Sequence, residues 1–106
     1  MSPLPLEIRL SVEASDDLDN ILQFTLEQWG EGQMEKYASF LQEAMILLAS
    51  FPNAGRKKDH LRLGCLCYQV GSHQIYYDTT NTLLRVARII HVQADDKGIF
   101  SHLETL

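Results

Sequence analysis

The sequence has no long apolar run and little of what a membrane or disulfide-rich protein needs. Its longest uninterrupted apolar stretch runs from Ala44 to Ala49, whereas a membrane-spanning helix needs about 20 such residues. The first residues, Met1 to Pro5, lack the basic and apolar segments of a secretion signal. Cys65 and Cys67 are two positions apart, which is poor geometry for a mutual disulfide on a strand. These absences predict a cytoplasmic protein with reduced thiols.

Motifs of small-molecule enzymes are also missing. The sequence contains no Gly-rich phosphate loop, no nucleophile elbow, no zinc-protease helix and no dinucleotide fingerprint. Cys65, Cys67, His60 and His73 lack the paired spacing of structural zinc ligands. We therefore expect no metal, no cofactor and no small-molecule substrate. The length and ordinary composition predict one domain over residues 1–106, with 1–5 and 96–106 as tails.

Charge is distributed unevenly. Residues 1–52 carry nine acidic side chains against two basic ones, Arg9 and Lys36, whereas residues 53–106 carry seven basic against five acidic. A net charge of −5 argues against a domain that holds nucleic acid by its overall field. The one basic cluster, Arg56-Lys57-Lys58 with Arg62, is typical of a solvated loop or of a contact with phosphates or acidic protein.

Periodicity predicts six elements. Leu6, Ile8, Leu10 and Val12 alternate with polar residues as in a strand. Ser11 or Ser15 then caps a helix that ends at Gly30, and a second helix runs to Pro52. The apolar stripes of the two helices are the following: Leu18, Ile21, Leu22, Thr25 and Trp29, then Met34, Tyr37, Leu41, Ala44, Met45, Leu48 and Phe51.

Three β-prone segments follow, at 65–70, 73–77 and 83–92, and turn residues separate them. We therefore predict an α+β fold of order β-α-α-β-β-β, in which an antiparallel helical hairpin packs on one face of a small antiparallel sheet.

The last strand is apolar on both faces. Leu84, Val86, Arg88 and Ile90 should point one way, and Leu83, Ala87 and Ile89 the other. Because the helices can cover only one face, the second should meet the tail from Asp95 to Leu106 or another protein chain.

Polar residues on the predicted sheet are the candidate site. Arg88 among aliphatic residues needs either a structural ion pair with a helix acid or an anionic ligand. His73, Tyr76, Tyr77, Arg88 and His91 could converge as acid, base and phosphate clamp of a metal-independent ribonuclease. Alternatively, such residues pack within the sheet and bond their polar ends.

A series of motifs resembles the ParE-type toxins of the RelE/ParE superfamily over about 11–95. The matching segments, in order, are Asp17 to Ile21, Gln28-Trp29-Gly30, Leu47-Leu48-Ala49, Pro52 to Arg56, Leu61 to Gly64, Val70 to Tyr77 and Arg88 to His91. The chain departs from the family pattern at Gly64-Cys65-Leu66 and Tyr76-Tyr77-Asp78, where a family arginine is replaced each time.

This resemblance implies a toxin of a type II toxin-antitoxin system, neutralised by a cognate ParD-like or other antitoxin. For ParE members it implies inhibition of DNA gyrase by binding, with Arg62, His73, Tyr77, Arg88 and His91 as target-contact candidates. The RelE branch instead cleaves mRNA on the ribosome, for which His73, Arg88 and His91 would be the catalytic residues. A third alternative is a degenerate toxin that retains only antitoxin binding. The antitoxin-binding residues stay open.

Overall fold

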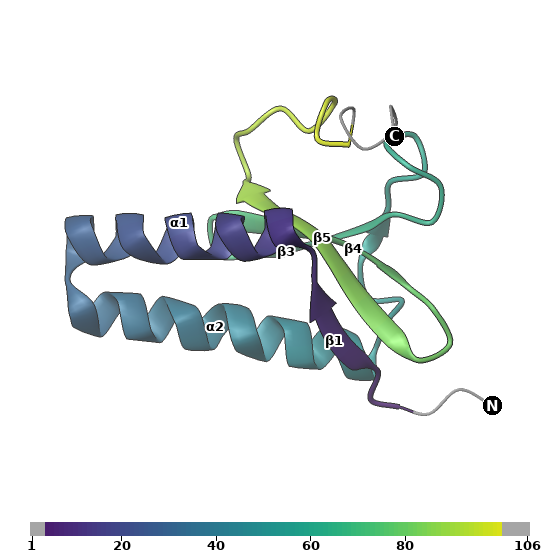
Figure 1. Ribbon diagram of the computed structural model, residues 1–106, viewed down its shortest axis with the longest axis horizontal. Helices are drawn as coiled ribbons and strands as arrows, with labels where there is room; N and C mark the ends of the chain where they lie inside the picture. The colour runs from purple at the N-terminus through teal and green to yellow at the C-terminus, as the bar shows by residue number, and fades with distance from the viewer. Residues whose placement is uncertain (1–3, 101–106) are drawn as a thin grey trace.

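The computed structural model describes residues 4–100, which form two long helices and a five-stranded sheet (Figure 1). In chain order the elements are β1 (Glu7–Leu10), α1 (Val12–Trp29), α2 (Glu31–Ser50), β2 (Arg56–Lys57), β3 (Leu66–Val70), β4 (His73–Thr79) and β5 (Leu83–His91). The strands lie in the order β1-β5-β4-β3-β2. The predicted α+β fold with a helical hairpin on a sheet is confirmed.

Two details of the sheet differ from the expectation. β1 runs parallel to β5, so the sheet is mixed rather than wholly antiparallel. Parallel neighbours need a long crossover connection, which the hairpin and the three intervening strands provide. In addition, Arg56 and Lys57 form a short edge strand paired with β3, where we expected only a loop.

The helix boundaries follow from capping residues. The Ser11 hydroxyl oxygen accepts a hydrogen bond from the Ala14 N–H at 2.9 Å and begins α1. Val12, predicted on the buried face of the first strand, is therefore the first helical residue and is exposed. Gly30, at φ 91°, is the only residue between the helices; this left-handed region favours glycine. α2 consequently begins at Glu31, earlier than expected.

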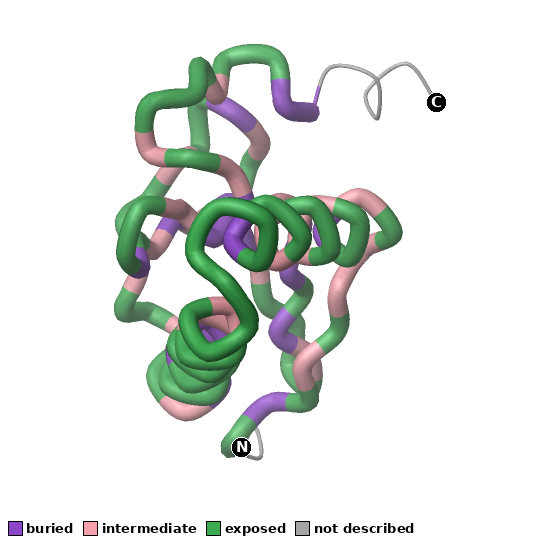
Figure 2. The backbone as a smooth tube through the Cα atoms, turned by 90° about the vertical axis from the view of Figure 1, so that its left-hand side faces the viewer, coloured by how far each residue is buried: buried purple, intermediate pink, exposed green. Residues whose placement is uncertain are grey.

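The ends of both predicted apolar stripes lie in solvent. Leu41 and Leu48 are fully buried, but Trp29 is 73% and Phe51 66% exposed. The tip of the hairpin extends past the sheet (Figure 1), and Figure 2 looks onto it and shows its turns exposed. Periodicity identified the inward face of each helix but could not show where the sheet beneath it ends.

The core consists of two clusters on opposite faces of the sheet. The larger lies between helices and sheet and includes Leu41, Leu48, Ile75 and Leu84. The members of the second, on the far face, are Leu61, Cys65, Cys67, Tyr76, Ala87, Ile99 and Phe100. β5 is thus covered on both faces, as predicted.

The C-terminal segment supplies part of the second cluster. Ile99 and Phe100, predicted to lie in a tail, are 8% and 2% exposed, and Phe100 lies under the Arg62 guanidinium, 4.1 Å from ring centroid to Cζ. Residues 101–106, the rest of that predicted tail, lie outside the described part of the chain.

A β-bulge changes the predicted alternation of β5. Tyr77 pairs with Val86 but Tyr76 pairs with Arg88, so Ala87 is an extra residue between two register pairs. Beyond it the faces exchange: Ile89 joins Val86 in the core under the helices, while Ile90 packs with the second cluster. The expectation that Val86 and Ile90 share a face was therefore wrong, because strict alternation holds only where no residue is inserted.

Candidate functional site

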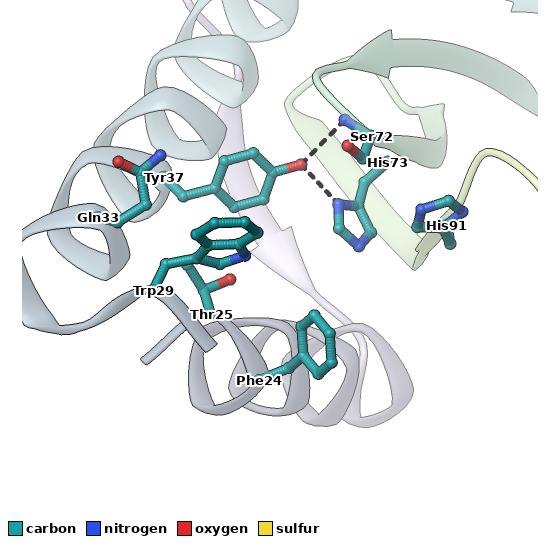
Figure 3. A pocket seen from close by; sticks show the side chains of 8 residues that line it. All are labelled: Phe24, Thr25, Trp29, Gln33, Tyr37, Ser72, His73 and His91. Carbon is teal, nitrogen blue, oxygen red and sulfur yellow. Dashed lines mark hydrogen bonds between the residues drawn. The ribbon is translucent and has the colours of Figure 1, made fainter. Parts of the chain in front are cut away.

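A hollow of about 520 Å³ lies where the hairpin tip faces the end of the sheet. We call it the tip pocket, and Figure 3 shows its lining. The lining residues are Phe24, Thr25 and Trp29 of α1, Gln33 and Tyr37 of α2, Ser72 and His73 at the β3–β4 turn, and His91 at the end of β5. The helical hairpin, the β3–β4 turn and the end of β5 thus meet at one site.

Tyr37 connects the hairpin to the sheet. Its hydroxyl lies 2.5 Å from His73 Nδ1 and accepts a hydrogen bond from the Ser72 N–H at 3.2 Å (Figure 3). The turn approaches so closely that a Cβ on Gly71, at φ 56°, would lie 2.9 Å from the Tyr37 hydroxyl oxygen. Burial raises the pKa of Tyr37, which therefore stays a neutral hydroxyl.

His73 and His91 are cross-strand partners. They pair directly in the β4–β5 register, and their rings meet edge to face with centroids 5.4 Å apart. Burial, and then the neighbouring His91, lowers the pKa of His73 below its ordinary value of 6.5. His73 is therefore neutral at pH 7, and its imidazole can act as a hydrogen-bond partner or a base.

The rim of the tip pocket is aromatic and exposed. Phe24 is 61% exposed and, with the still more exposed Trp29, presents a large apolar surface to water (Figure 3). Large aromatic rings exposed to water are typical of contact surfaces that another molecule covers. Sequence reasoning placed Trp29 in the buried stripe and did not single out Phe24. The signal that was missed is length: the two predicted helices are longer than the strands that could cover them.

Arg88 is held by an ion pair with α1. Its Nε and Nη2 atoms donate to the two carboxylate oxygens of Asp17 at 2.7 and 3.0 Å, and the Ile89 N–H donates to the same carboxylate at 2.9 Å. Both side chains are mostly buried, with 22% and 16% exposed. Of the two readings of Arg88, the structure shows the ion pair with a helix acid.

The two tyrosines of β4 lie inside the protein. Tyr77 is 1% exposed; its hydroxyl donates to the Pro52 carbonyl at 2.8 Å and accepts from the Gly55 N–H at 2.9 Å. Tyr76 is buried on the far face beside the Asp96 carboxylate, 2.8 Å away. Tyr77, predicted among the target contacts, is therefore bonded inside the core rather than displayed at the surface.

The remaining candidates are split between two faces. Arg62 lies on the far face, above Phe100 and 3.9 Å from Asp78. The two cysteines belong to the buried far-face cluster, whereas His73 lines the tip pocket. Only His73 and His91 of the proposed ribonuclease cluster come together. None of the residues lining the tip pocket is Lys or Arg.

Comparisons with known proteins agree with this architecture. Residues 8–95 match the family described as ParE toxin of type II toxin-antitoxin system, parDE. Toxin ParE1 of Caulobacter vibrioides is 32% identical over 83 residues, covering 78% of this chain and 85% of that protein. Toxin ParE1 of Mycobacterium tuberculosis (strain CDC 1551 / Oshkosh) is 34% identical over 87 residues, covering 81% and 89%.

The fold is shared with a solved structure from the chromosomal ParDE TA system of P. aeruginosa. The TM-score is 0.71 at 17% identity, over 83% of this chain and 97% of that one. The fold and the sequence matches together place this chain among the toxins of type II toxin-antitoxin systems. The chain belongs to the ParE toxin family. Among residues 4–100, neither helix is apolar enough over its length to cross a membrane.

Proposed function

We propose that this protein is a ParE-like toxin that inhibits DNA gyrase by binding it in the cytoplasm, and that a cognate antitoxin neutralises it. The observation that carries the proposal is the tip pocket, where Phe24 and Trp29 stand exposed beside His73 and His91. Exposed aromatic anchors around a hollow are what a protein–protein contact uses as its energetic centre. We assign gyrase contact to this pocket.

Binding fits the geometry better than RNA cleavage. A ribonuclease needs an acid, a base and a cation around one phosphate, but Arg88 is committed to Asp17 and Arg62 lies on the far face. The lining of the tip pocket holds imidazoles and aromatic rings but no Lys or Arg to bind a phosphate. The net charge of −5 supports the same conclusion.

The outer side of α2 and its C-terminal end carry exposed apolar side chains that could contact the antitoxin. Phe40, Leu47 and Phe51 recur at helical spacing and are 49%, 40% and 66% exposed. Exposed large apolar side chains gathered on one surface are expected to be covered by a partner. We propose that the antitoxin covers it, with a segment that orders on binding.

The test of the gyrase proposal is inhibition by purified protein. We expect it to block gyrase supercoiling and to increase gyrase-dependent DNA breaks, and Trp29→Ala and Phe24→Ala to lose both effects while remaining folded. Leu63→Ala is the matched control, because Leu63 is 88% exposed outside the pocket. Unchanged supercoiling at a large molar excess of toxin would contradict the proposal.

Induction of the toxin without antitoxin separates the alternatives. DNA damage with intact transcripts is expected. Transcripts cut on the ribosome, mapped by primer extension and lost in His91→Ala, would support the nuclease alternative instead. Harmless overexpression would indicate a degenerate toxin that retains only antitoxin binding.

A further inference from the structure

The end of β5 fixes which nitrogen of His91 carries the proton. The Gln93 N–H lies 3.1 Å from His91 Nδ1. A backbone N–H can only donate, so this ring nitrogen accepts the hydrogen bond. In the neutral ring the proton is therefore on Nε2, which makes Nε2 a hydrogen-bond donor.

Tyr37 fixes the proton of His73 in the same way. The Tyr37 hydroxyl oxygen already accepts from the Ser72 N–H, and His73 Nδ1 lies 2.5 Å from it. The single hydroxyl proton therefore points to Nδ1, and the neutral His73 ring carries its own proton on Nε2. Figure 3 shows Nδ1 turned toward Tyr37 and the other ring nitrogen pointing away from it. Both histidines thus present an Nε2–H donor.

Other donors line the tip pocket, and no acidic side chain does. The indole Nε1–H of Trp29 can only donate, and Figure 3 shows this nitrogen on the side of the indole that faces the pocket. The Gln33 amide adds N–H groups from α2. None of the eight lining residues is Asp or Glu. Asp17, in the adjoining hollow, is paired with Arg88. Hydrogen-bond donors therefore exceed acceptors in this pocket.

We propose that the tip pocket binds a carboxylate that is carried on an apolar or aromatic group. The carboxylate oxygens accept hydrogen bonds from the Nε2–H groups of His73 and His91, and the apolar group lies against Phe24 and Trp29. A hollow of about 520 Å³ has the size of a site for such a ligand. The identity of the partner rests on the proposed function: where gyrase contacts this pocket, the side chain that enters it is Asp or Glu beside apolar residues.

The donors favour this ligand over a cation or a phosphate. A cation would gain from the exposed aromatic rings, but the imidazole and indole N–H groups would face it with their positive ends. A phosphate dianion is bound in proteins chiefly by Arg and Lys, and the lining has neither. A carboxylate has one charge and two oxygens that only accept, which matches neutral N–H donors.

The test uses benzoate, which joins one carboxylate to one aromatic ring, and the full chain. Trp29 is the single tryptophan of the sequence, so its fluorescence reports on this pocket. We expect benzoate to change that fluorescence saturably. Benzamide has the same shape without the charge, and benzamidine reverses the charge. Each should bind at least about fivefold more weakly, as expected when a hydrogen bond to a charged group is lost.

Variants of the protein test the histidine donors. His91→Phe keeps an aromatic ring and removes the N–H, so it should weaken benzoate about fivefold, as expected for one hydrogen bond. His60→Phe is the matched control, because it makes the same change at an exposed position outside the pocket and should leave the affinity unchanged. Circular dichroism checks that both variants are folded.

The pH dependence gives a readout that pocket shape alone would not change. Burial lowers the pKa of His73 in the free protein, and a carboxylate beside the ring favours the charged imidazolium. Benzoate should therefore raise the pKa of His73 and bind more tightly as the pH falls from about 7.5 to about 6, where a carboxyl group stays ionised. Tyr37 stays neutral and Asp17 stays paired with Arg88 in this range, while His91 shares the effect. His73→Gln should reduce the pH dependence.

Four results would overturn the inference. The first is the absence of saturable benzoate binding, and the second is benzamidine binding as tightly as benzoate. The third is a His91→Phe effect no larger than that of His60→Phe. The fourth is a benzoate affinity that does not increase as the pH falls.

Failure of the gyrase proposal would look different. If benzoate binds as expected but the purified protein leaves supercoiling unchanged, the carboxylate site stands and gyrase is not its partner. If Trp29→Ala abolishes gyrase inhibition but benzoate does not bind, the gyrase contact stands and the carboxylate site is wrong.

Discussion

Breaking the contact between Asp17 and Arg88 should cost stability, because both side chains are mostly buried. We consider Asp17→Asn, which keeps the shape and one acceptor oxygen of the side chain but removes the charge. Three hydrogen bonds converge on the carboxylate, two from Arg88 and one from the Ile89 N–H. The variant can still accept from Ile89, so the main loss is the bidentate, charge-assisted pair.

The magnitude follows from burial. Breaking a fully buried ion pair costs roughly 3 to 5 kcal/mol, because the remaining charge is left without a partner. Here 22% of the Arg88 side chain and 16% of the Asp17 side chain are exposed, so water partly solvates the remaining guanidinium. We expect Asp17→Asn to lower the free energy of unfolding by about 2 kcal/mol, within the range for hydrogen bonds to charged groups.

The assay is a double-mutant cycle in urea. Asp17→Asn, Arg88→Gln and the double variant should give a coupling energy of about 1 to 2 kcal/mol. Asp16→Asn is the matched control, because it removes the same charge from the neighbouring, exposed position of α1. A coupling energy below about 0.3 kcal/mol, the usual error of additivity, would refute the reasoning. It would show that the ion pair contributes no more than a solvent-exposed one.

Three other measurements test the tip pocket and the far-face cluster. Gly71→Ala should destabilise more than Gly64→Ala, although both glycines have positive φ, because only at Gly71 does the added Cβ meet Tyr37; equal costs in thermal unfolding would contradict this. The lowered pKa of His73 means that the folded state favours the neutral imidazole. The free energy of unfolding should therefore keep its full value above pH about 6.5 and decrease as the pH falls below it. In His73→Gln the free energy of unfolding should decrease less between pH 7 and pH 5. Burial raises the pKa of Cys65 to about 11, so iodoacetamide at pH 8 should modify it only after urea unfolds the protein, and rapid labelling of the native protein would refute this placement.

Six of the seven elements within residues 4–100 are encoded locally and were predictable; the two-residue strand β2 was not. Ser11 and Gly30 mark the ends of α1 through cap chemistry, and turn residues separate β3, β4 and β5. The apolar character of β5 on both faces also predicted a second covering layer, which Ile99 and Phe100 provide. The family resemblance followed from ordered motifs over most of the chain, and the match over 8–95 confirmed it.

The site required the tertiary structure. A pairing of His73 with His91 depends on a register that the bulge at Ala87 sets, and alternation alone gave the wrong faces beyond it. Tyr77 looked available because a tyrosine on a strand has no sequence signal that separates a buried hydroxyl from an exposed one.

What the sequence by itself determined was the family, the order of helices and strands and the inward faces of the helices, because caps, turns and periodicity act over a few neighbouring residues. Only the tertiary structure decided that Trp29 and Phe24 stand in solvent beside two histidines and that Arg88 is held by Asp17. These features join residues far apart in the chain, and their positions depend on strand register and on the length by which the hairpin exceeds the sheet.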